Sequence, residues 1–199
     1  MKVIKNMRKV LFISCSYIIN YFNLKKNGVK YISFPHTRGI IHISAPKRSI
    51  LMGSNIVINS GKKANPVGIG FQTSLIVINE GKIVIGGNVG LSNVSIVSRI
   101  GVEIDDDVML GNGVCIWDTD FHDLTYEGRI KKKDRNIVSI PVEIKKGAFI
   151  GAGSIILKGV TIGEKSIVGA GSVVTKSIPP NQIWAGNPAR FIKCIREDS

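Results

Sequence analysis

VEIKKGAFIGAGSIILKGVTIGEKSIVGAGSVV, the stretch from Val142 to Val174, decides the fold because one pattern repeats through it without interruption. An aliphatic residue recurs at every sixth position, in the series Ile144, Ile150, Ile156, Ile162, Val168 and Val174. A small or β-branched residue stands two positions before each of them, in the series Val142, Ala148, Ser154, Val160, Ser166 and Ser172. A fixed short period of this kind is typical of a solenoid built from repeated units.

The spacing has a direct structural meaning. If each hexad forms one flat side of a coil, its aliphatic side chain points inward and stacks on its equivalents in the next coil. Three hexads then close a triangular turn, and successive coils pair as parallel strands about 4.8 Å apart. A β-sandwich would alternate with period two between irregularly spaced turns, and does not account for six consecutive hexads. The pattern therefore predicts an all-β parallel β-helix, although the spacing leaves its handedness open.

The same period continues upstream of the decisive stretch. Its inward positions there are Ile104, Leu110 and Ile116, preceded by Ile85, Leu91 and Val97. Between these two groups the register slips by one residue, which predicts a bulged corner at Ser98 to Gly101. Before Ile85 the pattern loses its regularity, so irregular early coils are expected.

The hexads stop between Trp117 and Ile140 and resume at Val142. A polar insertion in a solenoid is extruded from a corner, and such loops often carry function. His122 lies at the base of this insertion, and an imidazole with a pKa of about 6.5 can take a proton from an alcohol near neutral pH. Asp118 or Asp120 would orient the ring. The competing interpretation is a histidine that only caps the loop.

The net charge of +13 is unevenly distributed along the chain. No Asp or Glu precedes Glu80, whereas 12 of the 27 basic residues do, which leaves 15 bases against 14 acids in the remainder. The basic segment lacks the interleaved aromatic residues of a single-strand binding platform, so we do not expect a nucleic-acid partner.

The stretch from Val10 to Phe22 is apolar but shorter than the about 20 residues needed to span a bilayer. No small-residue cleavage site follows it, since Asn23 and Lys25 come next, so a signal peptide is not expected. We interpret residues 1–30 as a basic, apolar helical segment that packs on the body or rests on a membrane surface. Residues 31–193 form the β-helix domain, with the loop 117–141 extruded, and residues 194–199 form a tail.

Cys15, Cys115 and Cys194 lie far apart and show neither disulfide nor zinc spacing, which indicates a reducing, cytoplasmic compartment. Cys115 is interpreted as a small buried residue rather than a nucleophile. His36 and His42 are interpreted as structural, and with His122 they do not have the spacing of a zinc site. No metal is expected.

Residues Gly147 to Lys193, GAFIGAGSIILKGVTIGEKSIVGAGSVVTKSIPPNQIWAGNPARFIK, resemble the C-terminal half of the hexapeptide-repeat acetyltransferases. The resemblance extends from about Ile83 and is closest to the sugar and polysaccharide O-acetyltransferases, such as the maltose and galactoside enzymes. It implies a left-handed helix, a homotrimer, and acetyl-CoA bound along a groove between two subunits.

The resemblance also implies roles for single residues. In WDTDFHDL it places the catalytic base on His122, and in LSNVSIV it places the asparagine that contacts acceptor and acetyl group on Asn93. The motif DTDFH replaces the Gly-His-Pro of the galactoside enzymes in a loop one residue longer, so the acceptor need not be theirs. The motif is closer to those of the polysaccharide-modifying branch.

For acetyl-CoA, the resemblance implies contacts along the last coils and the C-terminal segment. The backbone of Ala152 and Ala170 would contact the pantetheine arm, and Phe149 would border the active-site tunnel. Thr175 and Lys176 would lie near the nucleotide, with Ala185 to Pro188 beside the adenine. Arg190 and Lys193 would bind the ribose phosphate.

The expected activity is acetyl transfer from acetyl-CoA to a hydroxyl of a sugar or polysaccharide precursor in capsule, exopolysaccharide or lipopolysaccharide synthesis. The basic N-terminus would hold the trimer at the inner membrane, where lipid-linked saccharides are assembled. Two alternatives stay open. One is a different acceptor, such as an amino sugar nucleotide or an antibiotic, and the other is a non-catalytic β-helix.

Overall fold

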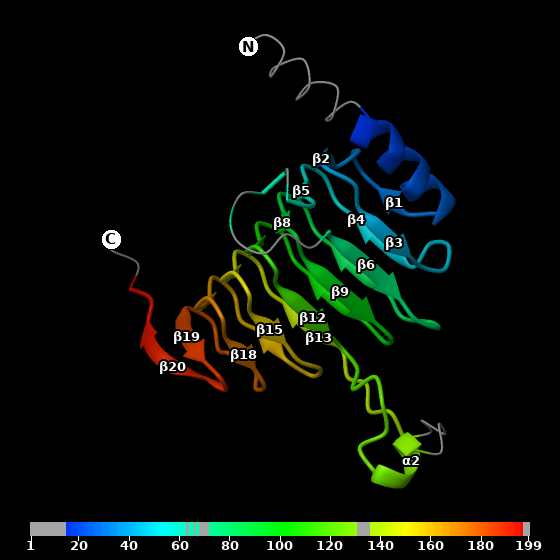
Figure 1. The fold of residues 1–199 in the computed structure, drawn as a ribbon. Coiled ribbons are helices and arrows are strands. Elements are labelled where there is room, and N and C mark those ends of the chain that lie inside the picture. Colours follow the sequence, from blue (N-terminus) through cyan, green and yellow to red (C-terminus); the bar gives the residue numbers. More distant parts are fainter. Residues whose placement is uncertain (1–14, 63, 66, 68–71, 131–135, 197–199) are drawn as a thin grey trace.

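The computed structural model describes residues 15–62, 64–65, 67, 72–130 and 136–196, and its strands wind around one axis (Figure 1). The predictions for residues 1–14, for residues 131–135 of the extruded loop, and for residues 197–199 concern parts of the chain outside these ranges. Three consecutive strands make one coil, and each strand pairs with its equivalent in the next coil, so three parallel sheets form the three sides.

The sheets are called A, B and C in the order in which the chain passes through them. Sheet A contains β1 (Lys30–Tyr31), β4 (Ile50–Met52), β7 (Ile83–Ile85), β10 (Val102–Ile104), β13 (Val142–Ile144) and β16 (Thr161–Ile162). Sheet B contains β2 (His36–Arg38), β5 (Val57–Asn59), β8 (Gly90–Ser92), β11 (Met109–Leu110), β14 (Phe149–Ile150), β17 (Ile167–Val168), β19 (Gln182–Gly186) and β20 (Ala189–Cys194). Sheet C contains β3 (His42–Ser44), β6 (Ser74–Val77), β9 (Ser95–Ser98), β12 (Cys115–Trp117), β15 (Ile155–Ile156) and β18 (Val173–Val174).

The core is the stack of inward aliphatic side chains that the hexads predict. All six predicted positions from Ile144 to Val174 are fully buried. Ile104 stands in register between Ile85 and Ile144, so equivalent side chains lie on top of one another. Burying one such side chain stabilises the fold by about 1.5–3 kcal/mol. The predicted parallel β-helix is thus confirmed.

Glycine at the corners follows from the close approach of successive coils. A Cβ atom added to Gly151 would lie 2.5 Å from the backbone nitrogen of Ala170, a distance that real Cβ contacts essentially never show. Any larger residue there would push two coils apart.

The expected irregularity before Ile85 is confirmed in the chain length between strands, which in this part of the chain is greatest between β5 and β6, at a corner between sheets B and C. It does not extend to strand pairing, because the early strands pair in the same register as the later ones, with Ile50 beside Ile83 and Leu75 beside Ile96. Coil pairing requires only that each strand supply its inward residue, so extra chain length is absorbed at corners.

The register slip begins one corner earlier than predicted, because the inward residue of β9 is Ile96, which pairs with Ile116, and not Val97. The corner before β9 is therefore one residue short and contains Asn93 in the left-handed region, with φ +50°. The next corner is correspondingly long. There the buried carboxylate of Asp118 accepts hydrogen bonds from the backbone amides of residues 99, 100 and 101 at 2.7–3.0 Å. These bonds stabilise the bulged corner.

A helix closes the N-terminal end of the solenoid. Residues 15–26 are helical and lie across the first coil (Figure 1). The fully buried Asn20 donates from Nδ2 to the Thr37 hydroxyl and the Gly39 carbonyl, both at 2.9 Å, and its Oδ1 accepts from the Ile41 amide at 3.0 Å. Asn23 donates to the Ile41 carbonyl at 3.2 Å. Asparagines thus satisfy backbone groups that a further coil would otherwise pair. Among the described residues, no helix is long and apolar enough to cross a bilayer.

We expect Asn20→Ala to lower the free energy of unfolding by about 3 kcal/mol, because it leaves buried backbone groups of the first coil without partners. Urea unfolding followed by circular dichroism measures this change. Ile18→Ala, an exposed position on the same helix, serves as control and should change the value by less than about 0.5 kcal/mol. Equal effects of the two substitutions would contradict the capping role of Asn20.

Candidate active site

One group of predicted site residues lies at the corner between sheets B and C, here called the B–C corner. Asn93 follows β8, Ala152 follows β14 and Ala170 follows β17. Their segments stack directly: the amide of Gly171 donates to the carbonyl of Ala152 at 2.8 Å. Ala152 and Ala170 therefore lie one above the other along the axis of the β-helix, with Asn93 further along the same corner.

A second group lies at the corner between sheets C and A, here called the C–A corner. Asp118, Asp120 and His122 follow β12, whereas Thr175 and Lys176 follow β18. Between these two strands sheet C contains β15, so the two segments lie two coils apart along the axis of the β-helix. The residues predicted as base and as nucleotide contacts thus share one corner.

The two corners are separated by the width of sheet C. Asn93 precedes β9 and His122 follows β12, and these two strands are parallel neighbours. At about 3.3 Å per residue, the offset along the strands is on the order of 15 Å. One copy of the chain therefore does not bring Asn93 and His122 together.

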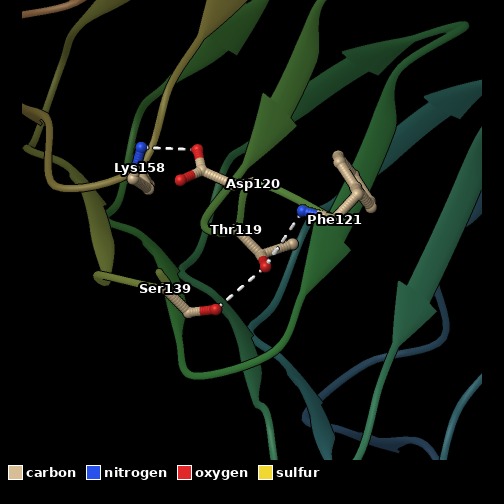
Figure 2. A network of polar contacts seen from close by, with 5 residues as sticks. All are labelled: Thr119, Asp120, Phe121, Ser139 and Lys158. Carbon is tan, nitrogen blue, oxygen red and sulfur yellow. Dashed lines mark hydrogen bonds and ion pairs between the residues drawn. The ribbon is translucent and has the colours of Figure 1, made fainter. Parts of the chain in front are cut away.

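His122 is exposed and follows a turn. Figure 2 shows the side chains of Thr119, Asp120, Ser139 and Lys158 that hold this turn in place. The amide of His122 donates to the Asp120 carbonyl at 2.7 Å, and the carboxylate of Asp120 forms an ion pair with Lys158 at 2.5 Å. The Thr119 hydroxyl accepts from Ser139 across the base of the loop at 2.9 Å. The imidazole is thus presented to solvent from a turn tied to the next coil by Lys158.

The second oxygen of Asp120 is buried and has no hydrogen-bond partner among the described residues. This oxygen leaves one acceptor at this corner, two residues before His122 in the chain. Asp118 is placed differently, since the backbone amides described above occupy both of its oxygens.

The rest of the loop is organised around Asp123. Its carboxylate accepts from the amide and the hydroxyl of Thr125, both at 2.9 Å, and from the Asn136 amide at 3.3 Å. These hydrogen bonds, that of the Thr125 amide above all, lower the pKa of Asp123. Gly128 in α2 (Tyr126–Ile130) approaches so closely that an added Cβ would lie 2.4 Å from the carboxyl carbon of Asp123. α2 projects away from the coils at the far end of the loop (Figure 1).

The remaining predicted cofactor residues lie at sheet B and its C-terminal edge. Phe149 is partly exposed on the outer face of sheet B beside Met109. Arg190 and Lys193 belong to β20, which pairs antiparallel with β19 at the edge of the sheet. Lys193 borders a surface hollow of about 560 Å³, which Ile167, Ile183 and Arg196 also line.

The other candidate residues from the sequence, one cysteine and two histidines, are less suited to a catalytic role. Cys115 is half-buried, and burial raises the pKa of its thiol, which disfavours the reactive thiolate. This agrees with its interpretation as a packing residue. His36 and His42 lie on β2 and β3, in the first coil, far along the chain from the loop.

Sequence reasoning missed Lys158 and the organising role of Asp123. Lys158 follows a buried hexad, and a half-buried carboxylate such as Asp120 needs a cation nearby. The two residues are 38 positions apart in the chain, so local spacing does not indicate that they pair. For Asp123 a local signal exists, because an Asp two residues before a Thr is typical of a side-chain-capped turn.

Comparison with known proteins adds independent information on the repeat. Residues 141–176 match the model of the bacterial transferase hexapeptide (six repeats) family. The galactoside O-acetyltransferase of Escherichia coli (strain K12) is 40% identical over 105 residues, which cover 53% of this chain and 50% of that protein. The chain spans about half the length of the curated relatives it matches.

Solved structures agree with the fold. A galactoside acetyltransferase in complex with coenzyme A superposes with a TM-score of 0.54 at 34% identity, over 72% of this chain and 65% of that one. AntD, an N-acyltransferase from Bacillus cereus in complex with dTDP and 3-hydroxybutyryl-CoA, superposes with a TM-score of 0.69 at 24% identity, over 88% of both chains. The resemblance to hexapeptide-repeat acetyltransferases and the left-handed β-helix predicted with it are confirmed.

Proposed function

We propose that this hexapeptide-repeat protein is an acetyl-CoA-dependent O-acetyltransferase that modifies a hydroxyl of a sugar or polysaccharide precursor for capsule, exopolysaccharide or lipopolysaccharide. The observation that carries the proposal is the placement of His122. It is exposed on a turn fixed by the Asp120–Lys158 ion pair, at the same corner as Thr175 and Lys176.

In the proposed mechanism, His122 removes the proton from the acceptor hydroxyl while the hydroxyl oxygen attacks the thioester carbonyl of acetyl-CoA. The carbon–sulfur bond then breaks, and the departing thiolate takes the proton from the imidazolium. The side chain of Asn93 is buried and its Nδ2 already donates to Oδ1 of Asn112 at 2.7 Å, so the second hydrogen of Nδ2 would be the one that is donated to the carbonyl oxygen as negative charge develops on it. Holding both substrates in one groove supplies the proximity, so no covalent enzyme intermediate is needed.

The separation of the two corners supports the homotrimer that the resemblance implies. Asn93 and His122 cannot meet within one copy, but the C–A corner of one copy can face the B–C corner of another around a threefold axis. A groove formed in this way would have Ala152 and Ala170 on one wall and Thr175 and Lys176 on the other. The site would then occur three times in each trimer.

In such a groove, this chain offers several contacts for coenzyme A. Lys193 borders the hollow at the C-terminal end of sheet B, and the exposed Arg190 lies on the same strand. Fixed cations there suit the ribose phosphate. Phe149, exposed in the middle of sheet B, would border the path to the reacting carbonyl.

The chemical class of the acceptor, a hydroxyl or an amine, is tested directly by acetyl transfer. An amine acceptor would use the same base and groove, and the likeness to AntD supports only the shared fold. Incubating the enzyme with acetyl-labelled acetyl-CoA and a panel of sugars, lipid-linked saccharides, amino sugar nucleotides and aminoglycosides identifies the acceptor class. Transfer to a sugar hydroxyl is expected, transfer only to amines would correct the proposal, and no transfer to any acceptor would favour a non-catalytic β-helix.

We expect His122→Ala to lower kcat by about 10²–10⁴-fold, because it removes the general base, while trimer stability changes little. Steady-state acetyl transfer measures kcat, and sedimentation measures the assembly. His42→Ala, an exposed histidine on β3, is the matched control and should retain full activity. Wild-type turnover in purified His122→Ala would exclude His122 as the base.

A mixing experiment tests whether each site draws on two copies. Asn93→Ala and His122→Ala are each expected to be inactive, and both are first checked for folding and trimer formation. When equal amounts are unfolded together and refolded, random assembly should restore about one quarter of the sites, because an intact Asn93 then meets an intact His122 across an interface. Failure to recover activity, with mixed trimers demonstrated by mass spectrometry, would mean that both residues act within one chain.

A further inference from the structure

The helix that closes the β-helix presents an unusual outer surface. Its buried side faces the first coil through Ser16, Asn20 and Leu24, whereas Ile18 and Phe22 on its outer side are 57% and 62% exposed. Ile32, directly after β1 in the first coil, is 81% exposed. Three large apolar side chains directed to solvent at one end of the molecule point to an interaction surface.

An aromatic cluster joins this helix to the first coil. Phe34 packs against Tyr17, Tyr21 and Tyr31, with ring centroids 4.4, 6.3 and 5.7 Å apart. All three tyrosines are partly exposed. Tyrosine has an apolar ring and a polar hydroxyl, so clusters of this kind suit the boundary between lipid headgroups and acyl chains.

A basic hollow opens next to the aromatic cluster. It has a volume of about 420 Å³, and its lining includes Lys25, Lys30, Lys47 and Arg48 together with Tyr21 and Tyr31. The Lys25 ammonium lies 6.0 Å from the centre of the Tyr21 ring. Since the sequence has no Asp or Glu before Glu80, the first coils contain no carboxylate to neutralise these four cations.

We propose that this end of the molecule, here called the N-terminal face, docks on an anionic phospholipid bilayer. Ile18, Phe22 and Ile32 enter the outer part of the hydrocarbon layer, and a headgroup phosphate occupies the basic hollow. Apolar and basic groups side by side are the combination that a peripheral membrane surface uses. A second copy of the chain is disfavoured as the occupant, because it would set the same four cations against each other.

This inference does not depend on the acetyl-transfer activity. It concerns the end of the β-helix that carries the first coils, whereas the candidate active site lies on later coils. If both proposals hold, the enzyme works at a membrane surface with the axis of its coils directed away from the bilayer.

The test uses the full chain and sedimentation with vesicles of phosphatidylglycerol and phosphatidylcholine, compared with vesicles of phosphatidylcholine alone. Binding is expected only to the anionic vesicles, and it should weaken at least about tenfold between low and high salt, as the surface potential is screened. Ile18→Ser/Phe22→Ser should weaken binding at least about tenfold, because it removes the inserted apolar area.

A matched pair of charge variants tests the hollow. Lys25→Gln/Lys47→Gln should weaken binding to anionic vesicles by about 30-fold, which corresponds to about 1 kcal/mol for each basic side chain near the surface. Lys82→Gln/Lys146→Gln removes the same charge from exposed positions on later coils and should change binding less than about threefold. All variants should unfold at the wild-type urea concentration and retain acetyl transfer.

Three results would overturn the proposal. One is equal binding to neutral and anionic vesicles, or equal effects of the two charge variants. Another is binding of inorganic phosphate in the hollow by a protein that binds no vesicles. This result would assign the hollow to a soluble phosphate compound. The third is a smaller assembly for Ile18→Ser/Phe22→Ser than for the wild type in lipid-free sedimentation, which would assign the face to a contact between copies.

Discussion

The structure depends on the stacking of each coil on the next. A single triangular coil cannot bury its inward side chain, so Ile104 is covered only because Ile85 and Ile144 lie on either side of it. The same stacking aligns the backbone groups that form the parallel ladders. This constraint explains why the inward positions are almost uniformly aliphatic, while the outer faces and corners vary.

Corners are where the chain can depart from the repeat without loss of stacking. The corner that contains Asn93 is short, and the next corner is long. The buried carboxylate of Asp118 accepts hydrogen bonds from the backbone of that long corner, and the extruded loop leaves the C–A corner after β12. The residues predicted as catalytic, Asn93 and His122, both lie at these departures. A rigid stack with variable corners therefore offers fixed positions along its edges for groups such as His122.

The two ends of the solenoid face the same problem, since their outer strands have backbone groups without a neighbouring coil. At the C-terminal end β20 turns back and pairs antiparallel with β19, so the parallel order ends there. At the N-terminal end, asparagines of the helical residues 15–26 satisfy the backbone directly. That solution leaves the other side of the helix available, and it is this side that carries the exposed Phe22 and the neighbouring basic hollow.

The sequence by itself determined the coil period, the inward residues from Ile144 to Val174, and the point at which the loop interrupts the repeat, because these follow from local spacing. It also singled out His122, because a titratable side chain at a break in a regular pattern is visible without coordinates. Only the tertiary structure decided which corner each residue occupies, and therefore that Asn93 and His122 stand apart within one copy. It alone revealed the pairing of Asp120 with Lys158 and the capping by Asn20. These contacts join residues far apart in the chain, and the lengths of the corners and coils between them determine whether they meet.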